Sequence, residues 1–250
     1  MIVNTMLWHS CGDFLASLIA ASAVCSDVDG TFLVDSFWKK AREVMIAIDA
    51  TDDANEALEY FTGSRSDIGD IAFIFRSVER LRKAGFSLQA IEKIVKVLLV
   101  RVDAMAFLKT FEKKAFVSYG IEQVIAELCR QHGLDEVETF ALRLVFGDDG
   151  VLVGRDAATV VTDGTKGYKF DTFCATHSLD PRRVVVLGDD LTDLLMLEKG
   201  IGIFVVPLAD DPQTGRGVSR LRTVENHWNR IGAFSVSDTF ASLLQLRQSR

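Results

Sequence analysis

Two stretches constrain the fold of this chain more than any others, because each is an apolar segment that runs directly into closely spaced aspartates. Residues 18–25 lead into Asp27 and Asp29, and residues 184–187 lead into an acidic group at 189–193. Short apolar runs bounded by turn residues are typical of buried strands. Because Asp27 and Asp29 are two positions apart, their side chains point to the same side of an extended backbone.

The paired carboxylates of Asp27 and Asp29 predict a bound cation. Burying two carboxylates beside each other is unfavourable unless a cation or a shared proton compensates for their charge. Carboxylate oxygens are preferred ligands of hard cations such as Mg²⁺. An Asp-x-Asp pair alone is weak evidence, since many such pairs lie on solvated turns. The second acidic group strengthens the prediction because it follows an apolar strand in the same way.

Elsewhere the hydrophobic pattern alternates between strands and helices. We expect strands at 116–118, 184–187 and 202–206, a hairpin of 142–146 with 151–153, and helices at 121–131, around 172–176 and at 236–246. Gly133 is the expected C-cap of the helix at 121–131. This alternation predicts an α/β fold with a Rossmann-like, doubly wound, mainly parallel sheet. Asp27, Ser118 and Asp189 would lie at carboxyl ends of strands, where such sheets bind ligands.

A helical block interrupts this alternation after the first strand. Helical periodicity is expected at 37–49, 53–61, 67–85 and 87–100, with Ser87 as the N-cap of the last helix. We therefore predict two domains, an α/β core formed by residues 1–34 and 113–250 and a helical insert formed by residues 35–112.

Composition narrows the classes of function. The chain has 250 residues and is 48% apolar, which is enough for one α/β domain with an insert. Its net charge of −7 argues against a general nucleic-acid binder. The four scattered cysteines predict buried thiols in a reducing compartment. Residues 14–24 are apolar, but no Lys or Arg precedes Lys39 and the segment is short. We therefore expect a cytoplasmic protein without a cleaved signal or a membrane partner.

The chain resembles the haloacid dehalogenase-like phosphohydrolases, whose four motifs can be matched in order. Asp-Val-Asp-Gly-Thr at 27–31 resembles the first motif and Ala-Phe-Val-Ser at 115–118 the second. Lys166 resembles the third, and Gly-Asp at 188–189 with Asp193 resembles the fourth. The resemblance covers nearly all of the chain from about residue 18 onward. It implies that the insert is a helical cap in the position called C1.

The resemblance also implies a role for each matched residue. Asp27 would be the nucleophile that forms an aspartyl-phosphate, and Asp29 would be the general acid and later the base. The expected Mg²⁺ ligands are Asp27, Asp29 through its backbone carbonyl, Asp189 and Asp193, although Asp193 could instead hold Lys166 or a metal-bound water. Phosphate contacts are expected from Ser118, Lys166, Thr31 and Gly30. Lys169, one helical turn later, competes with Lys166 for its role, and Asp190 is expected to be a bystander.

Within the family, the chain is most similar to the phosphoserine phosphatase-like branch. Residues 133–137 and 150–154 resemble a turn and a hairpin of that branch. Two positions depart from phosphoserine phosphatase itself. Ser36 stands where that enzyme has a Glu that holds the substrate amine, and Tyr119 replaces the first Gly of Ser-Gly-Gly. Both departures put phosphoserine in doubt as the substrate. Residues of the cap would determine specificity, and the candidates are Phe37, Trp38, Arg76 and Arg80.

Taken together, these features predict a phosphoric monoester hydrolase, a Mg²⁺-dependent phosphatase that acts on a small phosphorylated metabolite. A phosphotransferase that passes the same aspartyl-phosphate to an alcohol would carry the same motifs and differ in how well the cap excludes water. A non-catalytic binding protein with this fold is the third possibility, which intact Asp27, Asp29, Lys166 and Asp189 argue against. The motifs specify neither the substrate nor the oligomeric state.

Overall fold

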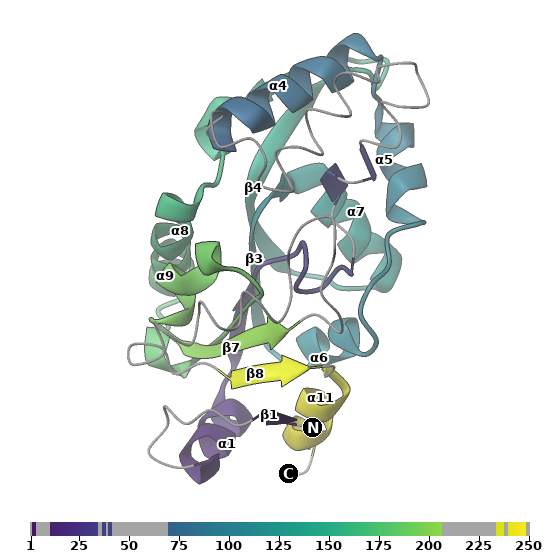
Figure 1. Ribbon diagram of the computed structural model, residues 1–250. Helices are drawn as coiled ribbons and strands as arrows, with labels where there is room; N and C mark the ends of the chain where they lie inside the picture. Colours follow the sequence, from purple (N-terminus) through teal and green to yellow (C-terminus); the bar gives the residue numbers. More distant parts are fainter. Residues whose placement is uncertain are drawn as a thin grey trace.

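The fold is built around one mixed sheet. A computed structural model describes residues 2–3, 11–34, 37–38, 40–41, 70–206, 234–237 and 240–248. Its strands are β1 (Ile2–Val3), β2 (Ala23–Ser26), β3 (Lys113–Ile121), β4 (Val137–Phe146), β5 (Leu152–Asp156), β6 (Val184–Gly188), β7 (Ile201–Val206) and β8 (Phe234–Ser237). They form an eight-stranded sheet in the order β1-β8-β7-β6-β2-β3-β4-β5 (Figure 1). The inner strands are parallel, whereas β1 and β5 run antiparallel to their neighbours.

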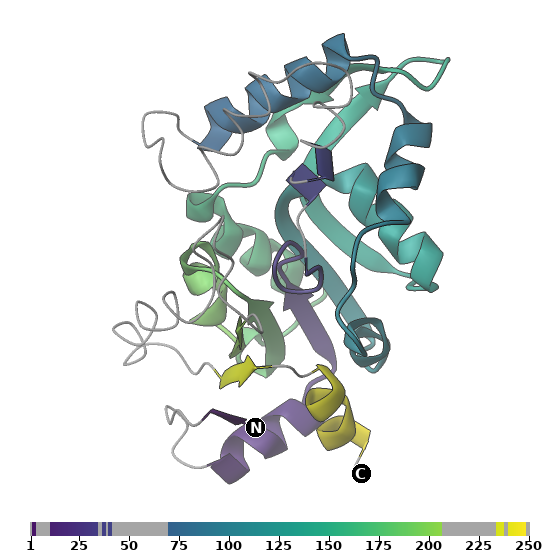
Figure 2. The same ribbon diagram turned by 45° about the vertical axis from the view of Figure 1, so that its right-hand side comes forward.

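Helices cover both faces of the sheet (Figures 1 and 2). The helices that cover the sheet are α1 (Cys11–Ala20), α6 (Ala104–Lys109), α7 (Glu122–His132), α8 (Asp163–Thr176), α9 (Leu194–Leu197) and α11 (Phe240–Gln248). Alternate residues of β2 contribute to two separate apolar clusters. Val24 belongs to the cluster that contains α1, α6, α7 and α11, while Ala23 and Cys25 belong to the one that contains α8 and α9. The predicted α/β fold with a doubly wound, mainly parallel sheet is therefore confirmed.

The winding direction of the sheet reverses at β2. From β2 the chain passes to its neighbour β3 and then to β4, and it later returns to β6 on the other side of β2. The backbone N–H of Asp27 donates to the carbonyl of Leu187 at 3.0 Å, which extends the β2–β6 pairing by one residue. Open α/β sheets bind ligands outside the carboxyl ends of strands at such a reversal. The ends of β2, β3 and β6 are therefore the place to look for a functional site.

Among the elements that the structure describes, helices α4 (Asp70–Lys83), α5 (Leu88–Val95) and α6 lie between β2 and β3 in the chain. Ser87 accepts a hydrogen bond from the N–H of Ala90, as expected of an N-cap. Helix α4 lies at the upper end of the molecule, beside β5 (Figure 1), where the Arg155 guanidinium lies 3.9 Å above the ring of Phe75. The helices expected at 37–49 and 53–61 lie mostly outside the described residues, so the boundaries of the insert stay a prediction.

The expectations for the last elements of the chain need correction. Residues 236–246 were expected to form one helix, but β8 extends to Ser237 and α11 begins at Phe240. Val236 lies in β8 because it pairs with Val205 of β7 and with Ile2 of β1, contacts that no local pattern reveals. Strands β3 and β4 are also longer than expected, because their first residues pair with each other in parallel. Helix α7 ends as predicted at Gly133, whose φ is 59°.

The two ends of the described chain pack together at the lower end of the molecule (Figure 2). The guanidinium of Arg247 in α11 donates to the carbonyl oxygens of Leu18, Ala21 and Thr110 and lies over the ring of Phe111. These bonds satisfy carbonyls at the end of α1, which a helix leaves unpaired. Among the described residues, no helix is long and apolar enough to cross a membrane. The thiols of Cys25, Cys129 and Cys174 are free and buried, as expected.

Candidate active site

A buried lysine bridges two buried aspartates at the carboxyl ends of β2 and β6. Lys166 Nζ donates to Oδ1 of Asp27 at 2.9 Å and to Oδ1 of Asp193 at 2.6 Å. Lys166 is 2% exposed, Asp27 6% and Asp193 0%. Residues this polar are rarely excluded from water unless they are paired. The structure thus brings together three of the predicted site residues, which lie far apart in the sequence.

Local structure places each member of this cluster. Asp27 directly follows β2, and Lys166 lies in the first turn of α8, which begins with a capping box formed by Thr162 and Thr165. Asp193 ends the short 3₁₀ helix Leu191–Asp193 that follows β6. The second carboxylate oxygen of Asp193 accepts hydrogen bonds from the backbone N–H groups of residues 189 and 190, each at 3.0 Å. Asp193 therefore both anchors Lys166 and shapes the turn after β6.

Asp189 lies against the loop that follows Asp27. Thr31 Oγ1 donates to Asp189 Oδ1 at 3.1 Å, and both residues are buried. Gly30 has a φ of +82°, and a Cβ atom on it would lie only 2.1 Å from Asp189 Oδ2. Glycine is needed here both for the left-handed backbone and for the close approach of the carboxylate. Thr31 and Gly30 thus contact Asp189, a different partner from the phosphate contacts expected of them.

Burial controls the protonation of this cluster. It raises the pKa of Asp27 to about 6, against the lowering effect of the Lys166 charge. It raises the pKa of Asp193 to about 7, again against the effect of Lys166. Burial alone would lower the pKa of Lys166, but the charges of Asp193 and Asp27 outweigh it and raise that pKa. Lys166 is therefore protonated at neutral pH, while the pKa values of the two carboxyl groups are raised toward neutrality.

The cluster fits a hard divalent cation. Asp27, Asp189 and Asp193 each offer a carboxylate oxygen, and these oxygens lie within 4.8 Å of one another. All three side chains are buried, and the positive charge of Lys166 offsets only one of their charges. Mg²⁺ prefers an oxygen donor set of this kind. The side chain of Asp29 is not in this group, because its Oδ1 accepts the backbone N–H of Phe37 at 3.0 Å.

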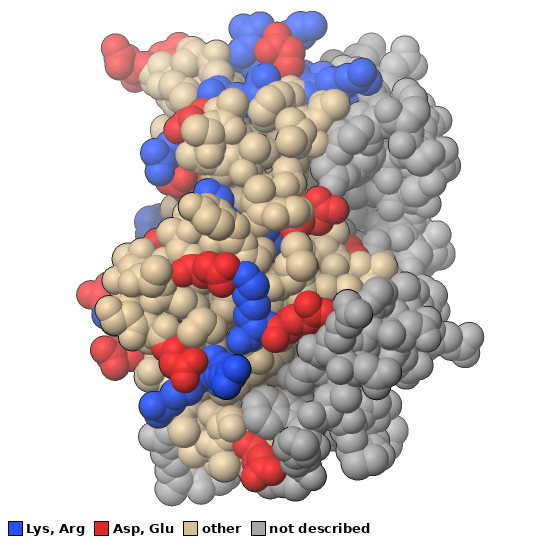
Figure 3. All heavy atoms as spheres, turned by 90° about the vertical axis from the view of Figure 1, so that its left-hand side faces the viewer, with Lys and Arg blue, Asp and Glu red and all other residues tan. Residues whose placement is uncertain are grey.

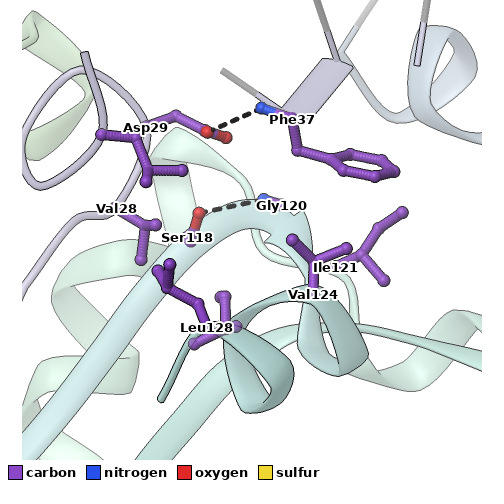
Figure 4. A pocket seen from close by; sticks show the side chains of 10 residues that line it. Val28, Asp29, Phe37, Ser118, Gly120, Ile121, Val124 and Leu128 are labelled. Carbon is purple, nitrogen blue, oxygen red and sulfur yellow. Dashed lines mark hydrogen bonds between the residues drawn. The ribbon is translucent and has the colours of Figure 1, made fainter. Parts of the chain in front are cut away.

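Asp29 and Ser118 lie at one side of a small pocket (Figure 4). Ser118 Oγ accepts the N–H of Gly120 at 3.0 Å, at the point where the pairing of β3 with β4 becomes irregular. The pocket encloses about 230 Å³, including space open to solvent. The rest of its wall is mostly apolar and consists of Val28, Leu33, Phe37, Gly120, Ile121, Val124, Ile125 and Leu128. A carboxylate and a hydroxyl thus face a largely apolar space.

Lys166 and not Lys169 contacts the aspartates. Lys169 Nζ lies 5.9 Å from the ring centroid of Phe140, a residue of β4. Asp190, the expected bystander, accepts the N–H of Leu191 at 2.6 Å and caps the short helix after β6. Lys169 lies about one turn farther along α8, where its ammonium lies over Phe140 and not at the end of β2.

The four candidate specificity residues of the cap differ in exposure, and Phe37 lines the pocket. Phe37 and Trp38 are buried, whereas Arg76 is exposed and Arg80 half-buried. Trp38 Nε1 donates to the carbonyl of Tyr119 at 3.3 Å. The ring centroid of Tyr119 lies 4.7 Å from Lys166 Nζ, a cation–π contact that the sequence did not indicate. Position 36 lies outside the described residues.

Charge on the neighbouring surface is mixed. Figure 3 shows acidic and basic side chains interspersed on the face that carries α8 and α9. Lys199 and Asp171 form an ion pair at 2.5 Å, with both side chains partly exposed. Exposed pairs of this kind add little to stability because water and salt screen them.

The chain is similar in sequence and in fold to known hydrolases. No family model matches the sequence. A phosphoserine phosphatase from Streptomyces coelicolor is 24% identical over 208 residues, which are 76% of this chain and 50% of the relative. This chain therefore spans about half the length of that curated relative.

Two solved structures share the fold. A haloacid dehalogenase (HAD) family hydrolase from Salmonella enterica serovar Typhi has a TM-score of 0.58 and 21% identity, covering 74% of this chain and 63% of its own. A phosphoserine phosphatase in its apo form has a TM-score of 0.62 and 17% identity, covering 90% of this chain and 98% of its own. The expected resemblance is thus found in sequence to a phosphoserine phosphatase and in fold to HAD family hydrolases.

Proposed function

We propose that this chain, which has the haloacid dehalogenase-like fold, is a Mg²⁺-dependent phosphatase that hydrolyses a small phosphorylated metabolite through an aspartyl-phosphate. The observation that carries the proposal is the buried group of Asp27, Asp189 and Asp193 at the carboxyl ends of β2 and β6, two of which pair with Lys166. A structural ion pair does not need a third buried carboxylate beside an ammonium that already pairs with two, because the excess negative charge is costly. The arrangement is explained if the site binds a cation, which offsets the excess negative charge, together with a phosphoryl group.

In the first step, a carboxylate oxygen of Asp27 attacks phosphorus, and the bond from phosphorus to the leaving oxygen breaks. Asp29 gives its proton to that leaving oxygen and becomes a carboxylate. Lys166, held at 2.9 Å from Asp27, reduces the repulsion between the nucleophile and the anionic phosphate. The products of this step are an alcohol and an aspartyl-phosphate on Asp27.

In the second step, Asp29 takes a proton from water, whose oxygen attacks the phosphorus of the aspartyl-phosphate. The bond between phosphorus and Asp27 breaks, which regenerates both aspartates and releases inorganic phosphate. Ser118 would donate its hydroxyl to a phosphoryl oxygen in both steps. Mg²⁺, held by Asp27, Asp189, Asp193 and the backbone carbonyl of Asp29, would supply positive charge that offsets the charge of the phosphoryl group.

The surroundings of Asp29 support a small substrate. The closed part of the pocket beside Asp29 and Ser118 has a volume of about 10 Å³, about the room that one water molecule needs. Its mostly apolar wall offers little to a highly charged leaving group. We propose that residues 35–112 form a cap over the core of residues 1–34 and 113–250, with Phe37 and Trp38 at its junction with the site. The ring of Tyr119, a residue of β3, lies near Lys166.

Release of inorganic phosphate from a panel of phosphorylated metabolites, with and without Mg²⁺, tests the proposal. The panel contains phosphoserine, sugar phosphates, nucleoside monophosphates and phosphocholine, and Asp27→Asn is the control. Asn keeps an oxygen that accepts the Lys166 hydrogen bond but is a poor nucleophile, so we expect a folded protein without turnover. Addition of acceptor alcohols separates hydrolysis from phosphotransfer. Equal phosphate release by wild type and Asp27→Asn would refute the mechanism.

A further inference from the structure

Residues 32–34, the outgoing segment, lead from the core toward the insert, and residues 99–101, the returning segment, lie on the way back to the core. The two segments are hydrogen-bonded to each other beside the site. The N–H of Val34 donates to the carbonyl of Leu99, and the N–H of Arg101 donates to the carbonyl of Phe32, both at 2.8 Å. Leu33 and Val100 form an antiparallel bridge between these bonds. The outgoing segment begins only a few residues after Asp27, so the returning segment lies against the loop that carries Asp29, Gly30 and Thr31.

Arg101 extends this contact into the loop itself. Its Nη2 donates to the carbonyl of Gly30 at 2.7 Å and its Nε donates to the carbonyl of Thr31 at 2.9 Å. Successive carbonyl groups point in opposite directions in an extended strand, so their convergence on one guanidinium requires a turned backbone. The φ of +82° at Gly30 provides that turn. The planar fork of arginine suits two converging acceptors, which a lysine ammonium does not match.

The same loop carries the contacts that place Asp189. Thr31 donates to Asp189 Oδ1 at 3.1 Å, and the absence of a Cβ on Gly30 lets the carboxylate approach. A change in the orientation of the two peptide groups held by Arg101 would therefore move both the Thr31 hydroxyl and the wall against which Asp189 packs. Arg101 is half-buried and belongs to a segment 70 residues downstream of Thr31.

We propose that Arg101 is a positioning residue for the cation site: by holding the Gly30 and Thr31 carbonyls, its guanidinium fixes the loop that orients Asp189. The inference rests on the metal site of the proposed function. Because Arg101 belongs to the returning segment, that segment would affect the cation affinity of the site directly. Groups that orient metal ligands typically change metal affinity or activity by about 10–100-fold when they are removed.

Calorimetric titration of Mg²⁺ into wild type, Arg101→Ala and Arg101→Lys tests this inference without turnover. We expect Arg101→Ala to bind Mg²⁺ about 10–100-fold more weakly, Arg101→Lys to be intermediate, and methylguanidinium to restore affinity to Arg101→Ala where methylammonium does not. Arg182→Ala, which removes an exposed arginine outside the site, is the control and should bind as wild type does. If Arg101→Ala fails to fold, Arg101→Lys carries the same comparison.

Unchanged Mg²⁺ affinity in folded Arg101→Ala, or in Arg101→Lys where only that variant folds, would overturn the inference, whatever the change in melting temperature. A purely structural role of Arg101 predicts that the loss of Mg²⁺ affinity equals the unfolded fraction of the variant and that methylguanidinium does not restore it. That result would also overturn the inference. If the wild type binds Mg²⁺ but releases no phosphate, the proposed phosphatase activity is contradicted. The positioning role of Arg101 is then still decided by the Mg²⁺ titration of the variants. Wild type that binds no Mg²⁺ would overturn both.

Discussion

Lys166 Nζ lies 2.6 Å from Oδ1 of Asp193, and both side chains are excluded from solvent. The same ammonium also neutralises part of the charge of Asp27. An ion pair buried in this way is costly to break, because removal of one partner leaves an uncompensated charge in the interior. The relationship makes Lys166 a determinant of stability as well as a proposed catalytic group.

Replacement of Lys166 by Met should destabilise the metal-free protein more at about pH 8 than at about pH 5. At about pH 5 both carboxyl groups of the folded protein are protonated. At about pH 8 the folded variant must either bury carboxylates without the Lys166 charge or bind protons there, and both cost stability. The expected cost at the higher pH is about 3–5 kcal/mol, measured by urea unfolding with EDTA. Lys169→Met is the matched control, since Lys169 lies outside the cluster. Equal losses for the two variants would contradict the assignment of Lys166.

Asp29→Asn should slow hydrolysis of an alkyl phosphate by about 10²–10⁴-fold. The loss should be much smaller for 4-nitrophenyl phosphate in the first step, because nitrophenolate leaves without needing a proton. Asn keeps the oxygen that accepts the N–H of Phe37, so the fold should persist. Pre-steady-state measurement of nitrophenol release and steady-state kcat separate the two steps. The same loss in the first step for both substrates would argue against general acid catalysis by Asp29.

The contribution of Asp27 and Asp193 to the stability of the metal-free protein should decrease as the pH rises from about 4 to about 7. Their folded-state pKa values are raised to about 6 and about 7, so the folded protein binds more protons than the unfolded chain over that range. Mg²⁺ needs the ionised carboxylates, so its affinity should rise with pH through the same range. Melting temperatures with EDTA and with Mg²⁺, across this range, measure both effects. An Mg²⁺ stabilisation that does not depend on pH would refute this coupling.

Gly30→Ala should weaken Mg²⁺ binding, whereas Gly85→Ala should not. Both glycines have positive φ, so alanine at either position is expected to cost about 1–2 kcal/mol in backbone strain. Only at Gly30 does the added methyl group meet Asp189, at 2.1 Å, while nothing lies within 4 Å at Gly85. Calorimetry and melting temperatures of the two variants separate strain from displacement of Asp189. Wild-type affinity in Gly30→Ala would show that this close approach is not needed.

Local chemistry allowed much of the fold and part of the candidate site to be predicted. Apolar runs that end in aspartates indicated β2 and β6, Ser87 and Gly133 indicated helix ends, and the alternation of strands and helices indicated the parallel sheet. These features depend on residues close together in the chain, where spacing and capping act directly. The order of the four motifs then indicated which residues to examine at the strand ends.

Only the tertiary structure decided how those residues meet. Whether a strand forms at Val236 depends on pairing with β7 and β1, and the contacts of Lys166 depend on the packing of α8 against the sheet. Arg101 carried no signal in the sequence, because its acceptors are backbone carbonyls about 70 positions upstream. Backbone acceptors are the same at every residue, so a sequence pattern cannot mark them. The sequence determined the fold class and the candidate acids, and long-range packing determined their partners, their burial and their protonation.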